Sequence, residues 1–65
     1  MKNNVRLLRR ERGLKQEQLA AAVGVSRQTI IAIENDKYNP SLELALRLGR
    51  FLEKPVEELF FPGEQ

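Results

Sequence analysis

Apolar positions along the chain recur at the three- and four-residue spacing of helices, and no segment alternates for long enough to indicate a central sheet. Glycine and proline residues fall between the periodic segments, where they indicate turns. The pattern therefore predicts an all-α fold with five helices in a single domain, residues 1–65. The predicted helices span residues 5–12, 16–23, 27–35, 42–52 and 55–60. We also expect the two chain ends to pair as a short two-stranded β-ribbon.

The ends of the predicted helices carry their own signals. Asn4, Ser26 and Ser41 each precede a helix, and side-chain oxygens of these residue types accept hydrogen bonds from the first free backbone N–H groups. Gly13 and Gly24 follow helices at positions where the backbone turns left-handed, a conformation that glycine adopts without strain. The connections between helices are therefore predicted to be short.

The fourth predicted helix is too apolar to bury only one stripe of side chains. Seven of its eleven residues are apolar, so we expect this helix at the centre of the fold. The last helix and the tail are apolar as well, and they are the expected surface for a second copy of the chain. Packing of these side chains onto the fourth helix within one monomer is the alternative. The expected dimer residues are Val56, Leu59, Phe60 and Phe61.

Composition narrows the class of protein. A chain of 65 residues has room for one small core, and self-association would add to its stability. It contains no cysteine and no histidine, so we expect no disulfide, no metal site and no cofactor. No segment has the length of a membrane span, and a cytoplasmic location is expected. We expect no enzyme activity, because imidazole, thiol and a glycine-rich phosphate loop are lacking, and neighbouring Glu57 and Glu58 point in different directions on a helix.

Charge is distributed unevenly along the chain. Residues 1–37 hold eight of the 11 lysine and arginine side chains and four acids, whereas residues 38–65 hold three basic and five acidic side chains. A basic half is typical of proteins that bind nucleic acid. An ordinary solvated helix face explains the arginine run equally well, so charge alone does not decide the function.

Residues 16–35, QEQLAAAVGVSRQTIIAIEN, contain two predicted helices joined by a tight turn at Gly24. Ala20 is small where the two helices cross, and Val25 fills the angle between them. This arrangement resembles the Cro and C-repressor (Xre) helix-turn-helix family, and the resemblance extends from Val5 to about Leu59. The stretches SRQTI and KYNPSLELAL are similar to small stand-alone repressors of the cytolysin-regulator type. Positions that match the family pattern are Gln16, Leu19, Ala20, Gly24, Val25, Ser26, Ile30, Ile33, Glu34, Pro40 and Ser41.

The resemblance implies a five-helix, lambda-repressor-like DNA-binding domain whose third helix enters the major groove at its N-terminal end. An arginine fork suits the guanine edge, a glutamine amide suits the adenine edge, and an alanine methyl can contact only the methyl of thymine. For the arginine, a phosphate clamp is the alternative to base reading. The residues expected to read bases are Arg27, Gln28, Thr29 and Ala32.

Residues around the reading helix are expected to contact the sugar-phosphate backbone. They are Gln16, Lys15, Ser26, Asn35, Lys37, Tyr38 and Asn39, with Arg10 and Arg12 as further candidates. The resemblance implies that Gln16 also braces the glutamine of the third helix, although a plain surface role is the alternative. Glu34 would repel DNA if it faced it. The resemblance implies instead that Glu34 pairs with Arg9 and ties the first helix to the third.

Three residues depart from the family pattern. Lys15 stands where a capping threonine or serine is usual, and its ammonium group cannot accept N–H bonds. Asp36 replaces a frequent glycine at a position where left-handed backbone is expected. Ile31 replaces a small polar residue, and contact with a base and contact with a partner protein are both open for it.

The expected function is that of a sequence-specific regulator of transcription that binds double-stranded DNA. We expect a repressor that binds a near-palindromic operator as a homodimer. The alternative is a protein-interaction module, such as an antitoxin-like or adaptor domain, which uses the same fold chiefly to bind a protein.

Overall fold

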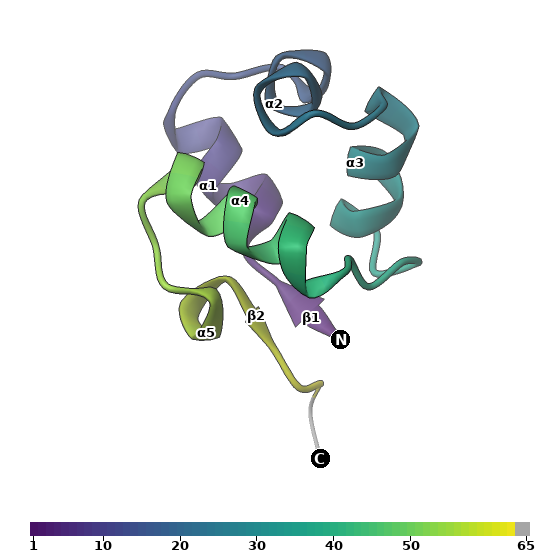
Figure 1. Cartoon of the computed structure of the whole chain (residues 1–65), viewed down its shortest axis with the longest axis vertical. Coiled ribbons are helices and arrows are strands. Elements are labelled where there is room, and N and C mark those ends of the chain that lie inside the picture. The colour runs from purple at the N-terminus through teal and green to yellow at the C-terminus, as the bar shows by residue number, and fades with distance from the viewer. Residues whose placement is uncertain (64–65) are drawn as a thin grey trace.

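Residues 1–63, the part of the chain that the computed structural model describes, fold into five helices and one two-stranded sheet (Figure 1). The expected all-α class with a terminal β-ribbon is confirmed. Glu64 and Gln65 lie outside the described residues. No helix within residues 1–63 combines the length and the apolar character that a membrane span requires. The elements in chain order are β1 (Lys2–Asn3), α1 (Val5–Glu11), α2 (Gln16–Val23), α3 (Arg27–Glu34), α4 (Leu42–Leu52), α5 (Val56–Leu59) and β2 (Phe60–Phe61).

Serine side chains begin two of the helices as expected. Ser26 Oγ accepts a hydrogen bond from the backbone N–H of Thr29 at 3.2 Å, and Ser41 Oγ accepts one from Leu44 at 3.2 Å. Such a cap contributes about 1 kcal/mol to stability. The first turns of α3 and α4 are therefore set by local sequence.

The start of α1 differs from the expectation. The expected cap at Asn4 is wrong, because the Asn4 side chain donates to the carbonyl oxygen of Glu58 at 3.2 Å. The backbone N–H of Val5 donates instead to Asn3 Oδ1 at 3.1 Å. The preceding asparagine thus takes the local role, and Asn4 ties α1 to the C-terminal part of the chain.

The turn between α2 and α3 requires a glycine. Gly24 has a φ of 78°, in the left-handed region that disfavours any residue with a Cβ. The following N–H, that of Val25, donates back to the carbonyl oxygen of Ala20 at 3.0 Å. Ala20 is buried where α3 crosses α2. This turn sets the angle at which α3 leaves α2, and so the direction in which its first residues project.

The core lies between α4 and the other helices. In Figure 1, α4 crosses the middle of the molecule, with α2 and α3 towards one end and α5 with the β-ribbon towards the other. Burial of each large aliphatic side chain contributes about 1.5–3 kcal/mol. The largest fully buried side chains come from every helix: Val5, Leu19, Ile30, Ile33, Leu48, Leu52 and Leu59.

α4 is apolar on more than its buried side. Leu44 and Leu48 lie in the core, as the central position expected for this helix requires. Leu42 and Leu46, four residues apart on another side, remain 71% and 44% exposed. One side of α4 therefore stabilises the monomer, and a second side presents apolar surface to the outside.

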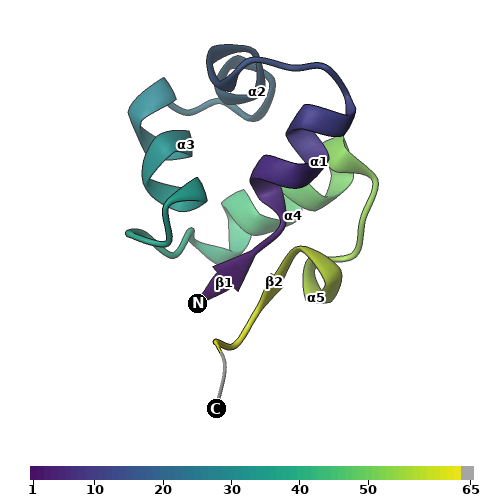
Figure 2. The same ribbon diagram turned by 180° about the vertical axis from the view of Figure 1, so that it is seen from behind.

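The two chain ends meet in the expected ribbon. β1 and β2 pair antiparallel, with Lys2 opposite Phe61 and Asn3 opposite Phe60. The backbone N–H of Asn4 continues the contact by donating to the carbonyl oxygen of Leu59 at 3.0 Å. Figure 2 shows the ribbon beside the loop that follows α3.

Candidate nucleic-acid interface

The first turn of α3 projects two polar side chains from the molecular surface. Arg27 and Gln28 are exposed, and neither side chain takes part in a hydrogen bond or ion pair within residues 1–63. The cap at Ser26 holds the backbone on which they stand. Their donors and acceptors are therefore available to an external ligand.

The other two expected base readers are less accessible. Thr29 is half-buried, and its hydroxyl lies 3.0 Å from Ser26 Oγ, so that it takes part in the helix cap. Ala32 is half-buried one turn further along α3. Ile31, which departs from the family pattern, is half-buried rather than fully exposed. These positions offer mainly apolar contact beside the two free polar side chains.

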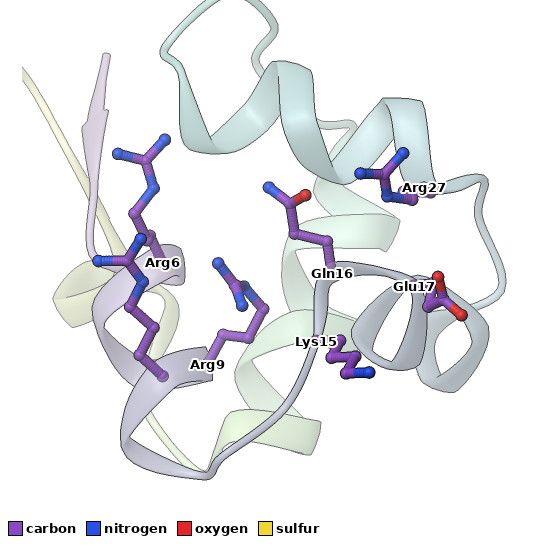
Figure 3. A pocket seen from close by; sticks show the side chains of 7 residues that line it. Arg6, Arg9, Lys15, Gln16, Glu17 and Arg27 are labelled. Atoms are coloured by element: carbon purple, nitrogen blue, oxygen red, sulfur yellow. The ribbon is translucent and has the colours of Figure 1, made fainter.

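A basic hollow of about 390 Å³ lies next to the start of α3 (Figure 3). Five of its seven lining side chains carry positive charge, and one carries negative charge. Charges of one sign gathered in a concave surface attract a ligand of the opposite sign. The residues that line the basic hollow are Arg6, Arg9, Arg10, Lys15, Gln16, Glu17 and Arg27.

The basic hollow brings together residues from α1, from the start of α2 and from the start of α3. Lys15, Gln16 and Arg27 were expected at the interface, and Arg10 was a further candidate. Arg6 was not expected there, although it lies four residues before Arg10 and so on the same side of α1. That spacing was the signal that would have found it.

Glu34 is the centre of a buried polar network behind the basic hollow. Its carboxylate forms the ion pair with Arg9 that the family resemblance implies, with Arg9 Nε to Glu34 Oε2 at 2.7 Å and Arg9 Nη2 to Glu34 Oε1 at 3.2 Å. The two residues are only 8% and 7% exposed. A second arginine, Arg6, places its Nε 3.5 Å from Glu34 Oε1. This network joins α1 to the end of α3.

The charge state of Glu34 follows from these contacts. Burial by itself would raise the pKa of its carboxyl group. Hydrogen bonds from Arg9 and Gln16, together with the positive charge of Arg9, outweigh burial and hold the pKa of Glu34 below its ordinary value. The carboxylate is therefore charged, and its charge is paired with Arg9 and Arg6 within the molecule.

Gln16 has a different partner from the one expected. Its Nε2 donates to Glu34 Oε1 at 3.1 Å, so it braces the glutamate at the end of α3 and not the glutamine at its start. The expected brace to Gln28 is absent within residues 1–63, because the carboxylate is the stronger acceptor and lies within reach. Gln16 thereby links the first residue of α2 to the network.

The α3–α4 loop, residues 35–41, begins in the left-handed backbone conformation expected for Asp36, whose φ is 60°. The N–H groups of Asp36 and Lys37 donate to the carbonyl oxygens of Ile33 and Ala32, at 3.1 and 2.9 Å. This pattern ends a helix and satisfies its last carbonyls. The expected backbone-contacting residues Lys37, Tyr38 and Asn39 are exposed on this loop.

Asn35 is oriented by a charged neighbour. Its Oδ1 accepts a hydrogen bond from Arg6 Nη2 at 2.6 Å. Since a guanidinium group can only donate, the amide NH₂ of Asn35 must be directed away from Arg6. The remaining donors of Asn35 suit a phosphate oxygen.

Lys15 replaces the usual capping residue without leaving the start of α2 unsupported. Its backbone N–H donates to Gln18 Oε1 at 2.8 Å, which is half of a capping box. The reciprocal half needs an acceptor at Lys15, and an ammonium group has none. The exposed ammonium group is left to line the basic hollow.

The expected dimer residues do not lie on one surface. Leu59 is 0% exposed and packs in the core of the monomer, so its expected place in a dimer contact is wrong. Phe61 lines a hollow with Leu7 and Leu8 on the α1 side. Val56 and Phe60 line a different hollow. Phe60 and Phe61 point to opposite faces because they are neighbouring residues of a strand.

Val56 and Phe60 adjoin the exposed side of α4. Leu42, Val56 and Phe60 line one hollow, and Leu46 and Val56 line the next. We call these four residues, Leu42, Leu46, Val56 and Phe60, the apolar face. Leu42 and Leu46 were not expected on this surface, because the apolar residues of the fourth helix predicted a central position for the helix.

Comparison with known proteins extends over this whole arrangement. The helix-turn-helix family profile matches residues 5–59, which include all five helices of the described chain. An uncharacterised HTH-type transcriptional regulator of Methanocaldococcus jannaschii is 50% identical over 60 residues, which cover 92% of this chain and 91% of that protein. The cryptic phage CTXphi transcriptional repressor RstR of Vibrio cholerae is 37% identical over 62 residues, which cover 95% of this chain and 56% of RstR.

A solved structure has the same fold. The restriction-modification controller protein C.AhdI from Aeromonas hydrophila superposes with a TM-score of 0.80 and 37% identity, over 88% of this chain and 86% of that one. The resemblance to the Cro and C-repressor family is therefore confirmed. Because members of this family are regulators and not enzymes, the expectation of no enzyme activity is confirmed as well. The chain belongs to the Xre-type helix-turn-helix family of transcriptional regulators.

Proposed function

We propose that this protein represses transcription by binding a specific double-stranded DNA site as a homodimer. The observation that carries the proposal is the first turn of α3, where Arg27 and Gln28 are exposed and unbonded beside the basic hollow. A helix that presents its first turn in this way can enter the major groove and place those side chains on base edges.

Base reading rests on two side chains. The amide of Gln28 can pair with N6 and N7 of adenine, and the guanidinium group of Arg27 can pair with O6 and N7 of guanine. Arg27 also lines the basic hollow, so a phosphate contact is its alternative role. Thr29 and Ala32 add apolar contact with a thymine methyl group.

Phosphate contacts surround the reading turn. On one side we place Lys15, Gln16 and Ser26, together with the hollow's arginines Arg6 and Arg10. On the other side the α3–α4 loop supplies its exposed side chains. Because the charged carboxylate of Glu34 is buried and paired with Arg9, the positive charge of Arg9 offsets its repulsion of the phosphates. The loop residues are Asn35, Lys37, Tyr38 and Asn39.

The homodimer is proposed to form through the apolar face. Exposed apolar side chains at Leu42 and Leu46 adjoin Val56 and Phe60, and burial of this area against a second copy would stabilise both. Two copies related by a twofold axis would bring two α3 helices to half-sites about 10 base pairs apart. A near-palindromic operator follows from that symmetry.

The proposal of repression rests on relatives. RstR is a transcriptional repressor and C.AhdI is a controller protein. We propose that this chain acts in the same sense, by covering its operator in the cytoplasm. It then needs no metal and no cofactor for the readout described above.

Binding to random duplex DNA at rising salt tests the DNA-binding proposal. The logarithm of the affinity should fall linearly with the logarithm of salt concentration, by about 0.9 for each phosphate neutralised. Selection of bound sequences from a random pool should then enrich a near-palindrome. Binding without a salt slope, or no enrichment, would favour the alternative of a protein-interaction module.

The dimer has its own test, with a matched pair of exposed leucines. Leu46→Glu places a charge on the apolar face, whereas Leu7→Glu places one on the α1 side, where Leu7 is 54% exposed beside Phe61. Sedimentation should show a dimer dissociation constant raised about tenfold or more by Leu46→Glu and little changed by Leu7→Glu. The reverse result would move the interface to the Phe61 side.

A further inference from the structure

One side chain at the N-terminal end of the molecule joins three segments of the chain. Asn3 Nδ2 donates to the carbonyl oxygen of Ile33 at 2.9 Å and to Asp36 Oδ1 at 3.2 Å. Asn3 Oδ1 accepts from the backbone N–H of Val5 at 3.1 Å. The orientation of the amide follows from its partners, since the nitrogen faces two oxygens and the oxygen faces an N–H group.

The bonds of Asn3 bridge a long separation in sequence. Ile33 and Asp36 lie 30 and 33 residues after Asn3. Both are at the end of α3, where the loop proposed to contact the DNA backbone begins. Figures 1 and 2 both show β1 beside this loop, from opposite sides of the molecule. The chain terminus is therefore attached to the loop by a side chain and not merely near it.

Asp36 is the residue of the loop that most needs support. Its φ of 60° is a conformation that residues with a Cβ rarely adopt. It also carries a negative charge on a loop proposed to approach phosphates, where that charge would be repelled. The amide of Asn3 donates to its carboxylate, which both holds the left-handed turn and gives the carboxylate a partner within the molecule.

We call the hydrogen bonds from Asn3 to Ile33 and Asp36 the tether. The strand that carries Asn3 also pairs with a residue of the proposed dimer surface. Asn3 is the register partner of Phe60 in the β-ribbon, and Phe60 belongs to the apolar face. The loop residues Asn39 and Pro40 line the same hollow of about 270 Å³ as Phe60. The ribbon is thus bonded to the loop through Asn3 and contributes Phe60 to the apolar face.

We propose that Asn3 is a positioning residue for DNA binding. It holds the α3–α4 loop in the conformation in which Lys37, Tyr38 and Asn39 can meet the sugar-phosphate backbone. This inference rests on the proposed function. The physical basis is preorganisation, because a loop that is already fixed loses less conformational freedom when it binds.

The test uses two neighbouring asparagines as a matched pair. Asn3→Asp keeps an acceptor for Val5 but removes both donors and sets a carboxylate against Asp36. Asn4→Asp makes the same change of charge one residue later, where the lost bond joins Glu58 and not the loop. Purified full-length variants are compared for affinity and salt dependence on the duplex selected by the unmodified protein.

Asn3→Asp should weaken binding about tenfold more than Asn4→Asp and should lower the salt slope by about 0.9, the value for one lost phosphate contact. Its base preference should be unchanged, because the first turn of α3 is not touched. Equal affinities and slopes for the two variants would overturn the proposal while leaving the proposed function intact. Failure of the unmodified protein to bind any duplex would overturn both.

A readout without DNA follows the loop directly. Amide hydrogen exchange at Asp36 and Lys37, whose N–H groups close the end of α3, should be about tenfold faster in Asn3→Asp than in Asn4→Asp. Unchanged exchange would show that the tether does not order the loop, and would overturn the proposal.

The double variant Asn3→Asp with Asp36→Asn provides a rescue. It exchanges donor and acceptor across the same contact and restores the original net charge, and an asparagine tolerates the left-handed backbone. Both the exchange protection and the salt slope should return towards those of the unmodified protein. A double variant as impaired as Asn3→Asp alone would contradict a role through this bond.

Discussion

The two ends of α3 differ in almost every property that matters for recognition. At its start, Arg27 and Gln28 are exposed and form no bond within the described chain. At its end, Glu34 is held by Arg9 and Gln16, and Asn35 is held by Arg6. One short helix thus has a first turn whose polar side chains are free and a last turn whose polar side chains are bonded to the rest of the fold.

Under the proposed function, specificity and stability are assigned to separate turns of the same helix. A side chain that reads bases must keep its donors and acceptors open until the ligand arrives. A side chain that anchors the helix must satisfy its own donors and acceptors within the fold. Substitutions at the two ends should therefore fail in different ways.

The largest effect should come from removing the anchor. Glu34→Ala leaves the buried guanidinium group of Arg9 without its partner, so the free energy of unfolding should fall by about 3–5 kcal/mol in chemical denaturation. Glu43→Ala is the matched control, because Glu43 pairs with Arg47 on the exposed side of α4 and should cost about 0.5 kcal/mol or less. Equal losses of unfolding free energy for the two variants would contradict the role of Glu34 as the anchor of α3.

A smaller and different effect is expected at the reading end. Gln28→Ala should reduce discrimination at one base pair of each half-site by about 1–3 kcal/mol, measured on the selected duplex and its single-base variants. Its unfolding free energy should stay within about 0.5 kcal/mol of the original, because the side chain that is removed is exposed and forms no hydrogen bond.

Arg27→Ala distinguishes base reading from a phosphate contact for Arg27. A base reader loses preference at one position, whereas a phosphate clamp loses affinity evenly across sequences.

The smallest expected effect is on the unfolding free energy at acidic pH. The pKa of Glu34 is lower in the folded protein than its ordinary value of 4.5, so the unfolded chain binds a proton more readily. The stability contributed by this group is therefore complete above that ordinary value and is lost as pH falls below it. In a plot of unfolding free energy against pH, Glu34→Gln should reduce the slope at acidic pH. Gln28→Ala should leave that slope unchanged. A steep slope that survives Glu34→Gln would assign it to other carboxylates.

Local features of the fold could be predicted from the sequence. Ser26 and Ser41 cap their helices, and Gly24 and Asp36 take the left-handed backbone. Each of these depends on residues no more than a few positions apart. The ribbon and the Arg9 and Glu34 pair were also foreseen, the latter through family resemblance.

The features that could not be predicted all depend on distant partners. Gln16 donates to Glu34 and not to Gln28. Asn3 donates to the carbonyl oxygen of Ile33 beside the loop, and Arg6 lines the basic hollow. Each polar side chain had several chemically acceptable partners in the sequence. Only distance in the folded chain excluded the others.

The order of the five helices, their ends to within one residue, and the turn that needs a glycine could be predicted from the sequence, whereas Phe60, predicted in the last helix, lies in β2. These properties follow from backbone sterics and short-range hydrogen bonds, which neighbouring residues control. Which apolar residues remain exposed depends on how the helices pack against one another. Leu59 is buried while Leu42 and Leu46 are exposed, because a helix with apolar residues on two sides can bury only the side that its neighbours cover.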